Sequence, residues 1–173
     1  MSNTMLKLCR QTLVACAAVA LLAPITAKAD SFENDFWWLA DPIEGLWNAK
    51  VTITNCATGL PLPVSFEAMG LFGRGGSFNN TDAQNPLMPT LRSSILGTWK
   101  RVHARTYQFA FKTFRFDAGG TFIGTQVVRH TLTLAKDGKS YASAGTSQAY
   151  DVAGNPLTGP PTGCSISTAT RFE

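Results

Sequence analysis

Residues 43–56 read IEGLWNAKVTITNC, and this stretch decides the fold. Its alternation predicts a β-strand over 45–54, with a Gly-x-Trp at the head and a cysteine just after the end. A second cysteine, Cys164, begins the last strand that the sequence predicts. In a closed meander the first and last strands are antiparallel neighbours. We therefore expect Cys56 and Cys164 to meet at the seam where the sheet closes on itself.

The first residues predict a secretory signal peptide. Lys7 and Arg10 precede the apolar run LVACAAVALL, and an Ala-Lys-Ala cleavage pattern ends at Ala29. The run is too short for a membrane span of about 20 apolar residues. A lipoprotein that uses Cys16 is the weaker alternative, because this cysteine lies inside the apolar run and not after it. We predict that residues 1–29 are cleaved and that the protein is exported to the periplasm or the extracellular medium.

Cleavage leaves 144 residues, enough for one domain, with 12 basic and 11 acidic side chains and a net charge of +1. The basic character of the whole chain therefore gives no reason to expect nucleic acid as a partner. Two cysteines remain, and in an oxidising compartment they are expected to form one disulfide that closes 109 residues. Neither has a histidine or second cysteine nearby, so we expect no metal and no cofactor.

No segment has a convincing helical period, and alternation and turn signals predict an all-β fold. Short connections such as Asp137-Gly138 favour a meander in which each strand pairs with the next. The expected fold is an eight-stranded antiparallel up-and-down barrel over residues 45–173, closed by the disulfide. Two long loops, 79–94 and 151–163, interrupt it. The predicted strands cover residues 45–54, 63–72, 75–81, 95–101, 105–116, 120–134, 139–150 and 164–172.

The cysteine pair also predicts a register at the seam. If Cys56 and Cys164 lie opposite each other, Trp47 falls opposite Glu173 and Ala49 opposite Arg171. Trp47 and Arg171 then become diagonal neighbours on one face, where a guanidinium over an indole is favourable.

Gly45, Trp47 and Arg171 together resemble the pattern of lipocalins and their calycin relatives. This resemblance implies a barrel that holds a small apolar ligand, with the three residues acting in structural closure. Four further stretches resemble a family of exported bacterial proteins without an assigned activity, which implies the strand map and the cysteine pair but no chemistry. They are GLWNAKVTITNCATGLPLP, GRGGSF, GTWKRVHARTYQFAFKTFRFDAGGTFIGTQVV and TGCSISTATRFE.

Period-two patterning predicts a barrel interior that is aromatic on one wall and small on the other. A four-residue turn at 117–120 would place Tyr107 opposite His130, Phe109 opposite Val128 and Phe111 opposite Gln126. Across the Asp137-Gly138 hairpin, Gly145 falls beside His130 and Ala149 beside Gln126. The residues predicted to line a ligand site are Trp99, Tyr107, Phe109, Phe111, Gln126, Val128 and His130.

His130 is the sharpest single candidate in this interior. A buried histidine near Tyr107 could act as a general acid or base or anchor a polar ligand. The favoured interpretation is a core histidine hydrogen-bonded to Tyr107 or to a serine such as Ser143. No hydrolase or metalloprotease motif is present, so no catalytic residue is assigned beyond the two candidates.

Three functions follow from these features. The favoured one is binding of a small, mostly apolar ligand in the barrel. The second is a protein-interaction or inhibitor module that uses residues 31–44 and 79–94, and the third is a small isomerase or cyclase that uses His130 and Tyr107. The aromatic arm over residues 30–44 is expected to plug one barrel end. A membrane barrel would invert the patterning, and polar outer faces with Gln108, Lys112 and Arg129 argue against it.

Overall fold

The computed structural model describes residues 40–83, 91–159 and 162–173. Within them the chain forms β-strands, one turn of 3-10 helix (η2, Arg74–Gly76) and no α-helix. The strands are β1 (Gly45–Thr54), β2 (Pro61–Gly73), β3 (Ser77–Asp82), β4 (Leu91–Arg92), β5 (Ile95–His103), β6 (Thr106–Phe116), β7 (Phe122–Leu134), β8 (Ser140–Tyr150) and β9 (Gly163–Arg171).

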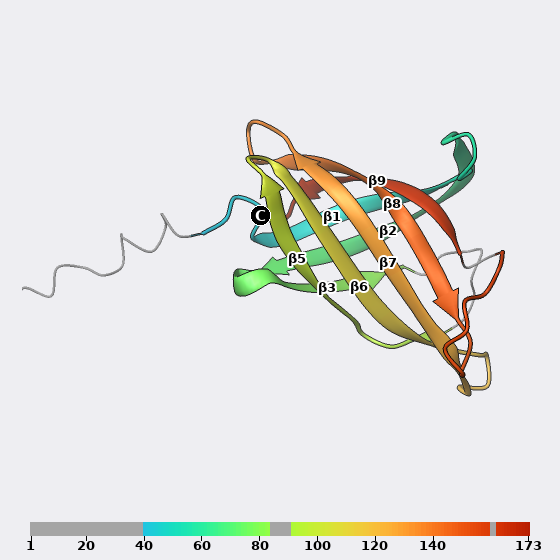
Figure 1. The fold of residues 1–173 in the computed structure, drawn as a ribbon. Helices are drawn as coiled ribbons and strands as arrows, with labels where there is room; N and C mark the ends of the chain where they lie inside the picture. The colour runs from blue at the N-terminus through green and yellow to red at the C-terminus, as the bar shows by residue number, and fades with distance from the viewer. Residues whose placement is uncertain (1–39, 84–90, 160–161) are drawn as a thin grey trace, which may run out of the picture. The chain divides into compact units, whose positions relative to one another are not determined.

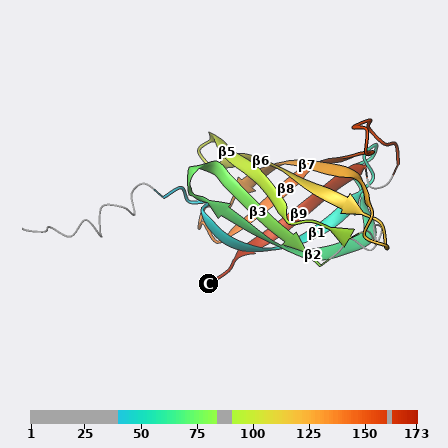
Figure 2. The same cartoon turned by 90° about the horizontal axis from the view of Figure 1, so that it is seen from below.

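Eight of these strands close into an antiparallel barrel (Figure 1). Each pairs with its neighbour in the order β1-β2-β3-β5-β6-β7-β8-β9, and β9 returns to pair with β1. Figure 2 shows the same barrel from below, with β3 between β2 and β5. The predicted eight-stranded up-and-down barrel is confirmed. The short β4 lies outside this order and, among the described strands, pairs with the end of β6. Because β3 extends to Asp82 and β4 covers Leu91–Arg92, the predicted loop 79–94 was too long at both ends.

The disulfide between Cys56 and Cys164 is confirmed, with 5.2 Å between the two Cα atoms. The register predicted from it was wrong by two residues. Trp47 pairs directly with Arg171, and Cys164 pairs with Thr54. Cys56 lies two residues beyond the end of β1, so the disulfide joins residues that are not directly opposite.

The pairing of β6 with β7 was also wrong by two residues. Phe109 faces His130, Phe111 faces Val128 and Thr113 faces Gln126, while Tyr107 faces Leu132. The connection takes five residues, 117–121, and Ile123 is an extra residue that forms a bulge beside Gly124. A shift of two leaves every side chain on its predicted face. The β7–β8 register, with His130 opposite Gly145 and Gln126 opposite Ala149, is confirmed.

One end of the barrel is filled by large side chains, and we call it the closed end. Its fully buried residues include Ile43, Trp47, Phe72, Tyr107 and Leu132. Ile43 belongs to the described part of the predicted arm, residues 40–44. The aromatic residues Phe32, Phe36, Trp37 and Trp38 lie outside the described residues.

At the closed end, Arg171 packs against both Trp47 and the backbone of Gly45. The Arg171 guanidinium lies 4.3 Å from the centre of the Trp47 ring and donates to the Glu44 carbonyl at 2.8 Å. The Trp47 indole donates to the Ile43 carbonyl at 2.8 Å. Gly45 has a φ of +125°, and a Cβ there would lie 2.8 Å from Arg171 Nη1. Only glycine allows this backbone and this approach, so the three residues form one structural unit.

Candidate ligand-binding cavity

The other end of the barrel is hollow. A cavity of about 130 Å³ extends from His130 to the end where β1 finishes and β9 begins. Its wall combines aromatic rings from β2, β3, β6 and β8 with small or aliphatic side chains from β1, β2, β7 and β9. The lining includes Phe66, Phe78, Phe109, Phe111 and Tyr141, with Ala49, Val51, Ala68, Val128 and Ser165.

The structure places five of the seven predicted lining residues at this cavity: Phe109, Phe111, Gln126, Val128 and His130. The other two take part in the closed end. The Trp99 indole donates to the Gly73 carbonyl at 2.8 Å, which ties β5 to the end of β2. The Tyr107 hydroxyl donates to Asp41 at 2.6 Å and accepts from Arg101 at 3.1 Å. Burial, followed by the bond to Asp41, raises the pKa of Tyr107 to about 12.

His130 forms the polar part of the cavity wall, and it bonds to serines. Its Nδ1 lies 2.9 Å from Ser143 Oγ and its Nε2 lies 3.0 Å from Ser165 Oγ. Ser143 is in turn 2.6 Å from Ser167. The ring reaches Ser165 by crossing Gly145, where a Cβ would lie 2.4 Å from His130 Cδ2. The sequence suggested Ser143 or Tyr107 as the hydrogen-bond partner of His130; the structure shows the bond to Ser143 and none to Tyr107. Ser165 and Ser167 were missed, because finding them requires the β8–β9 register.

Burial lowers the pKa of His130 to about 4, so the imidazole is neutral at pH 7. A neutral ring with one donor and one acceptor suits two hydroxyl neighbours. Such a weak base is poorly suited to proton abstraction near pH 7, and the Tyr107 hydroxyl is bonded to Asp41 and Arg101. His130 and its serine partners therefore form a fixed polar group in the mostly apolar wall of the cavity.

The low pKa of His130 predicts a pH-dependent stability. Between pH 6.5 and 4 the unfolded chain binds a proton at this residue and the folded chain does not. Stability should therefore rise with pH across this window, by about 3 kcal/mol in total, and be fully present above pH 6.5. Urea unfolding of the wild type and His130→Gln at pH 7 and pH 4.5 isolates this effect from that of the carboxylates. Equal losses in the two proteins would contradict it.

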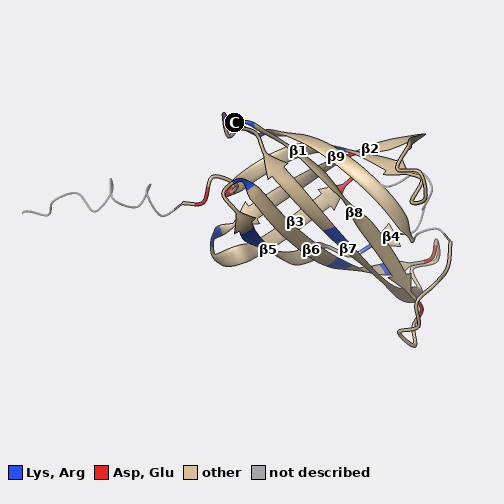
Figure 3. Ribbon diagram, turned by 45° about the horizontal axis from the view of Figure 1, so that its top comes forward, with Lys and Arg blue, Asp and Glu red and all other residues tan. Residues whose placement is uncertain are grey.

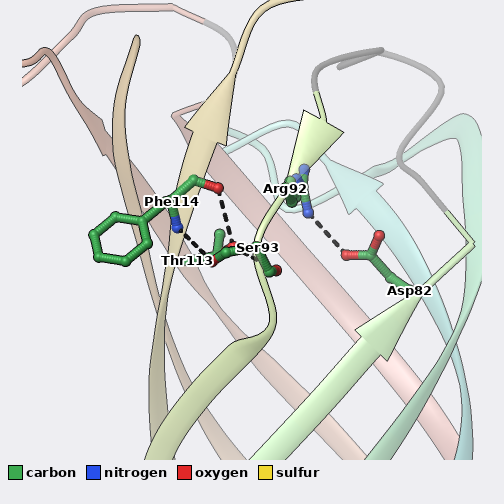
Figure 4. Close-up of polar contacts among 5 residues, drawn as sticks. All are labelled: Asp82, Arg92, Ser93, Thr113 and Phe114. Carbon is green, nitrogen blue, oxygen red and sulfur yellow. Dashed lines mark hydrogen bonds and ion pairs between the residues drawn. The ribbon is translucent and has the colours of Figure 1, made fainter. Parts of the chain in front are cut away.

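Charged side chains gather where the cavity meets the barrel end, a place we call the mouth. Asp82 on β3 and Arg92 on β4 form an ion pair of 2.8 Å between Oδ2 and Nη1, with side chains only 8% and 13% exposed. Figure 4 shows this pair spanning from β3 to β4. Both residues line the cavity. Figure 3 colours the Lys and Arg residues blue and the Asp and Glu residues red, and some of the blue lies near β4.

An irregularity in the chain turns Arg92 toward the interior. Arg92 pairs with Arg115, and Leu96 pairs with Lys112. The segment from Arg92 to Leu96 therefore contains one residue more than the opposite segment of β6. One extra residue places the side chains on its two sides on opposite faces of the sheet, so Arg92 faces the interior although Leu96 faces outward. Serine and threonine side chains replace the lost ladder bonds: Ser93 Oγ accepts from the Phe114 amide at 3.0 Å, and Thr113 donates to the Ser93 carbonyl at 3.1 Å (Figure 4).

Arg115 is a second arginine beside the mouth, because it is the cross-strand neighbour of Arg92. It lies on the same face of β6 as Phe109 and Phe111 and is only 7% exposed. Its Nε and Nη1 atoms are buried and find no hydrogen-bond acceptor among the described residues. Burial and then the charge of Arg92 lower the pKa of Arg115. The alternation of β6 could have revealed this residue from the sequence, whereas Arg92 depends on the irregularity.

The described part of the chain has neither a metal-binding cluster nor a membrane-spanning helix. No three His, Cys, Asp or Glu side chains gather there as a metal ion would require. Nor does any helix in it have the length and apolar character needed to cross a membrane.

Comparison with known proteins gives no family for this chain. A scan against protein-family models found no match, and searches of curated proteins and of solved structures found none either. The function is therefore argued from the cavity itself.

Proposed function

We propose that the protein binds a small, mostly apolar ligand inside the hollow end of its barrel. The observation that carries the proposal is the cavity of about 130 Å³ with its wall of Phe66, Phe78, Phe109 and Phe111. A barrel that served only as a scaffold could fill this end as it fills the other, where Trp47, Phe72 and Tyr107 belong to one buried cluster. Concave, apolar sites with a few placed polar groups are the usual form of small-molecule sites.

The size of the cavity restricts the ligand. An engineered cavity of about 150 Å³ accommodates benzene, whereas sites for drug-sized ligands measure about 300–1,000 Å³. The part of the ligand inside this barrel therefore has about the size of a phenyl ring or a short alkyl chain. Aromatic walls favour a ring through edge and face contacts, and the His130–Ser165 pair offers a polar contact at its inner end.

Export to the periplasm or extracellular medium is part of the proposal. The Cys56–Cys164 disulfide suits an oxidising compartment. The signal sequence that predicts export falls in residues 1–29, outside the described residues. The alternative of a protein-binding module stays a prediction, because most of its proposed surface, 31–39 and 84–90, also lies outside them.

An enzyme that uses His130 and Tyr107 together is less favoured by the geometry. Phe109, not Tyr107, faces His130 across the β6–β7 pair. The Tyr107 hydroxyl is bonded to Asp41 and Arg101 at the closed end, and His130 is bonded to two serines.

Filling the cavity should abolish binding. Val128 lines the cavity, and Val127 on the same strand faces outward. We expect Val128→Phe to weaken binding of the neutral probe 3-phenylpropan-1-ol, which has a single phenyl ring, at least tenfold in a calorimetric titration. Val127→Phe adds the same side chain to the outer face and should bind like the wild type. Thermal melts of both variants check the fold. Equal probe binding by the two variants would contradict the proposed site.

A further inference from the structure

Two arginines lie side by side at the mouth, an arrangement that does not by itself stabilise the fold. Arg92 and Arg115 are direct cross-strand neighbours, and both are largely buried. Like charges directly opposite each other on two strands destabilise the pair. Burial adds to this cost, because an ionised group out of water needs partners to offset its desolvation.

Asp82 compensates one of the two arginines. It binds Arg92 at 2.8 Å, and the Nε and Nη1 atoms of Arg115 have no acceptor in the described part of the chain. Arg92, Arg115 and Asp82 are the inward-facing charged side chains described at this end, and together they carry a net charge of +1. Asp82 and Arg92 line the apolar cavity, and Arg115 adjoins it as the cross-strand neighbour of Arg92. Such buried and unpaired donors are rare in folded proteins and call for an explanation.

We propose that the ligand carries one carboxylate, which Arg115 binds at the mouth while the apolar part lies among the phenylalanines. This inference rests on the proposed function and specifies the class of ligand. A carboxylate supplies acceptors for the N–H groups of Arg115. It also brings one negative charge to a site with one excess positive charge. A phosphate monoester would bring more charge than the site offsets, which favours the monoanion. The ligand is thus a small aromatic or short-chain carboxylic acid.

The experiment compares three ligands that differ in the head group. Calorimetric titration at pH 7 measures 3-phenylpropanoate, 3-phenylpropan-1-ol and 3-phenylpropyl phosphate against the purified, disulfide-bonded protein. The test variant is Arg115→Gln, which removes the charge at the mouth. The control is Arg129→Gln, which removes the same charge from an exposed position on the outer face of β7.

We expect the wild type and Arg129→Gln to bind the acid at least about tenfold more tightly than the alcohol, the size of effect that a charge-assisted hydrogen bond gives. Arg115→Gln should lose this preference and bind the alcohol as before. Retained binding of the alcohol also shows that this variant is folded.

Three results would overturn the inference. The first is equal binding of acid and alcohol by the wild type, which leaves the proposed function intact. The second is a preference for the acid that persists in Arg115→Gln. The third is tighter binding of 3-phenylpropyl phosphate than of the acid, which would assign the mouth to a phosphate. If the wild type binds none of the three compounds, the proposed function fails together with the inference.

Discussion

Replacing Cys56 and Cys164 together with serine is expected to lower the free energy of unfolding by about 4 kcal/mol. The disulfide joins residues 108 positions apart in the chain. A cross-link that closes so long a loop restricts the unfolded chain strongly, and loop-closure entropy gives about 4–5 kcal/mol for this length. The folded barrel should change little, because the β1–β9 ladder from Trp47 to Thr54 keeps the seam closed without the bond.

Urea unfolding of the wild type and the double variant measures this loss. A reducing agent provides the internal control, since it should destabilise the wild type to the level of the variant and leave the variant unchanged. A loss below about 1 kcal/mol would show that the cross-link contributes little beyond the strand ladder.

The second large effect is expected at Trp47. Substitution by alanine should cost about 4 kcal/mol, the range for a large aromatic side chain removed from a core. Trp47 is fully buried, its ring centre lies 5.0 Å from that of Tyr141, and the Arg171 guanidinium lies over its ring. Its loss also leaves the Ile43 carbonyl without the indole donor.

Trp99 is the matched control, because it lies in the second Gly-x-Trp of the chain and is only partly buried. We expect Trp99→Ala to cost about 2 kcal/mol, roughly half as much. Chemical denaturation of both variants distinguishes the two tryptophans. A larger loss at Trp99 than at Trp47 would contradict the structural role assigned to the seam.

The strand map could be predicted because it depends on alternation and turn residues, which are local. The registers could not be derived from turns alone. The five-residue connection at 117–121 and the extra residue Ile123 together moved β6 by two positions along β7. Because two is the period of a strand, Phe109, Phe111 and His130 still face the interior as predicted.

The candidate site was predictable only in part. The inward face of β6 gave Phe109 and Phe111, and extending the same alternation leads to Arg115. Arg92 faces inward only because of one extra residue before Leu96. Whether the interior is filled depends on how side chains from opposite walls meet, so the division into a filled end around Tyr107 and a hollow end around His130 required the structure.

The most direct test of the central claim is a methyl NMR titration with 3-phenylpropan-1-ol, which is neutral and therefore independent of the mouth. Val51 and Val128 line the cavity, while Leu132 and Leu134 belong to the core of the closed end. We predict saturable shifts of the methyl signals of Val51 and Val128, with Leu132 and Leu134 nearly unchanged. Shifts confined to outer-face residues such as Val127, or no shifts at all, would contradict a ligand site inside the barrel.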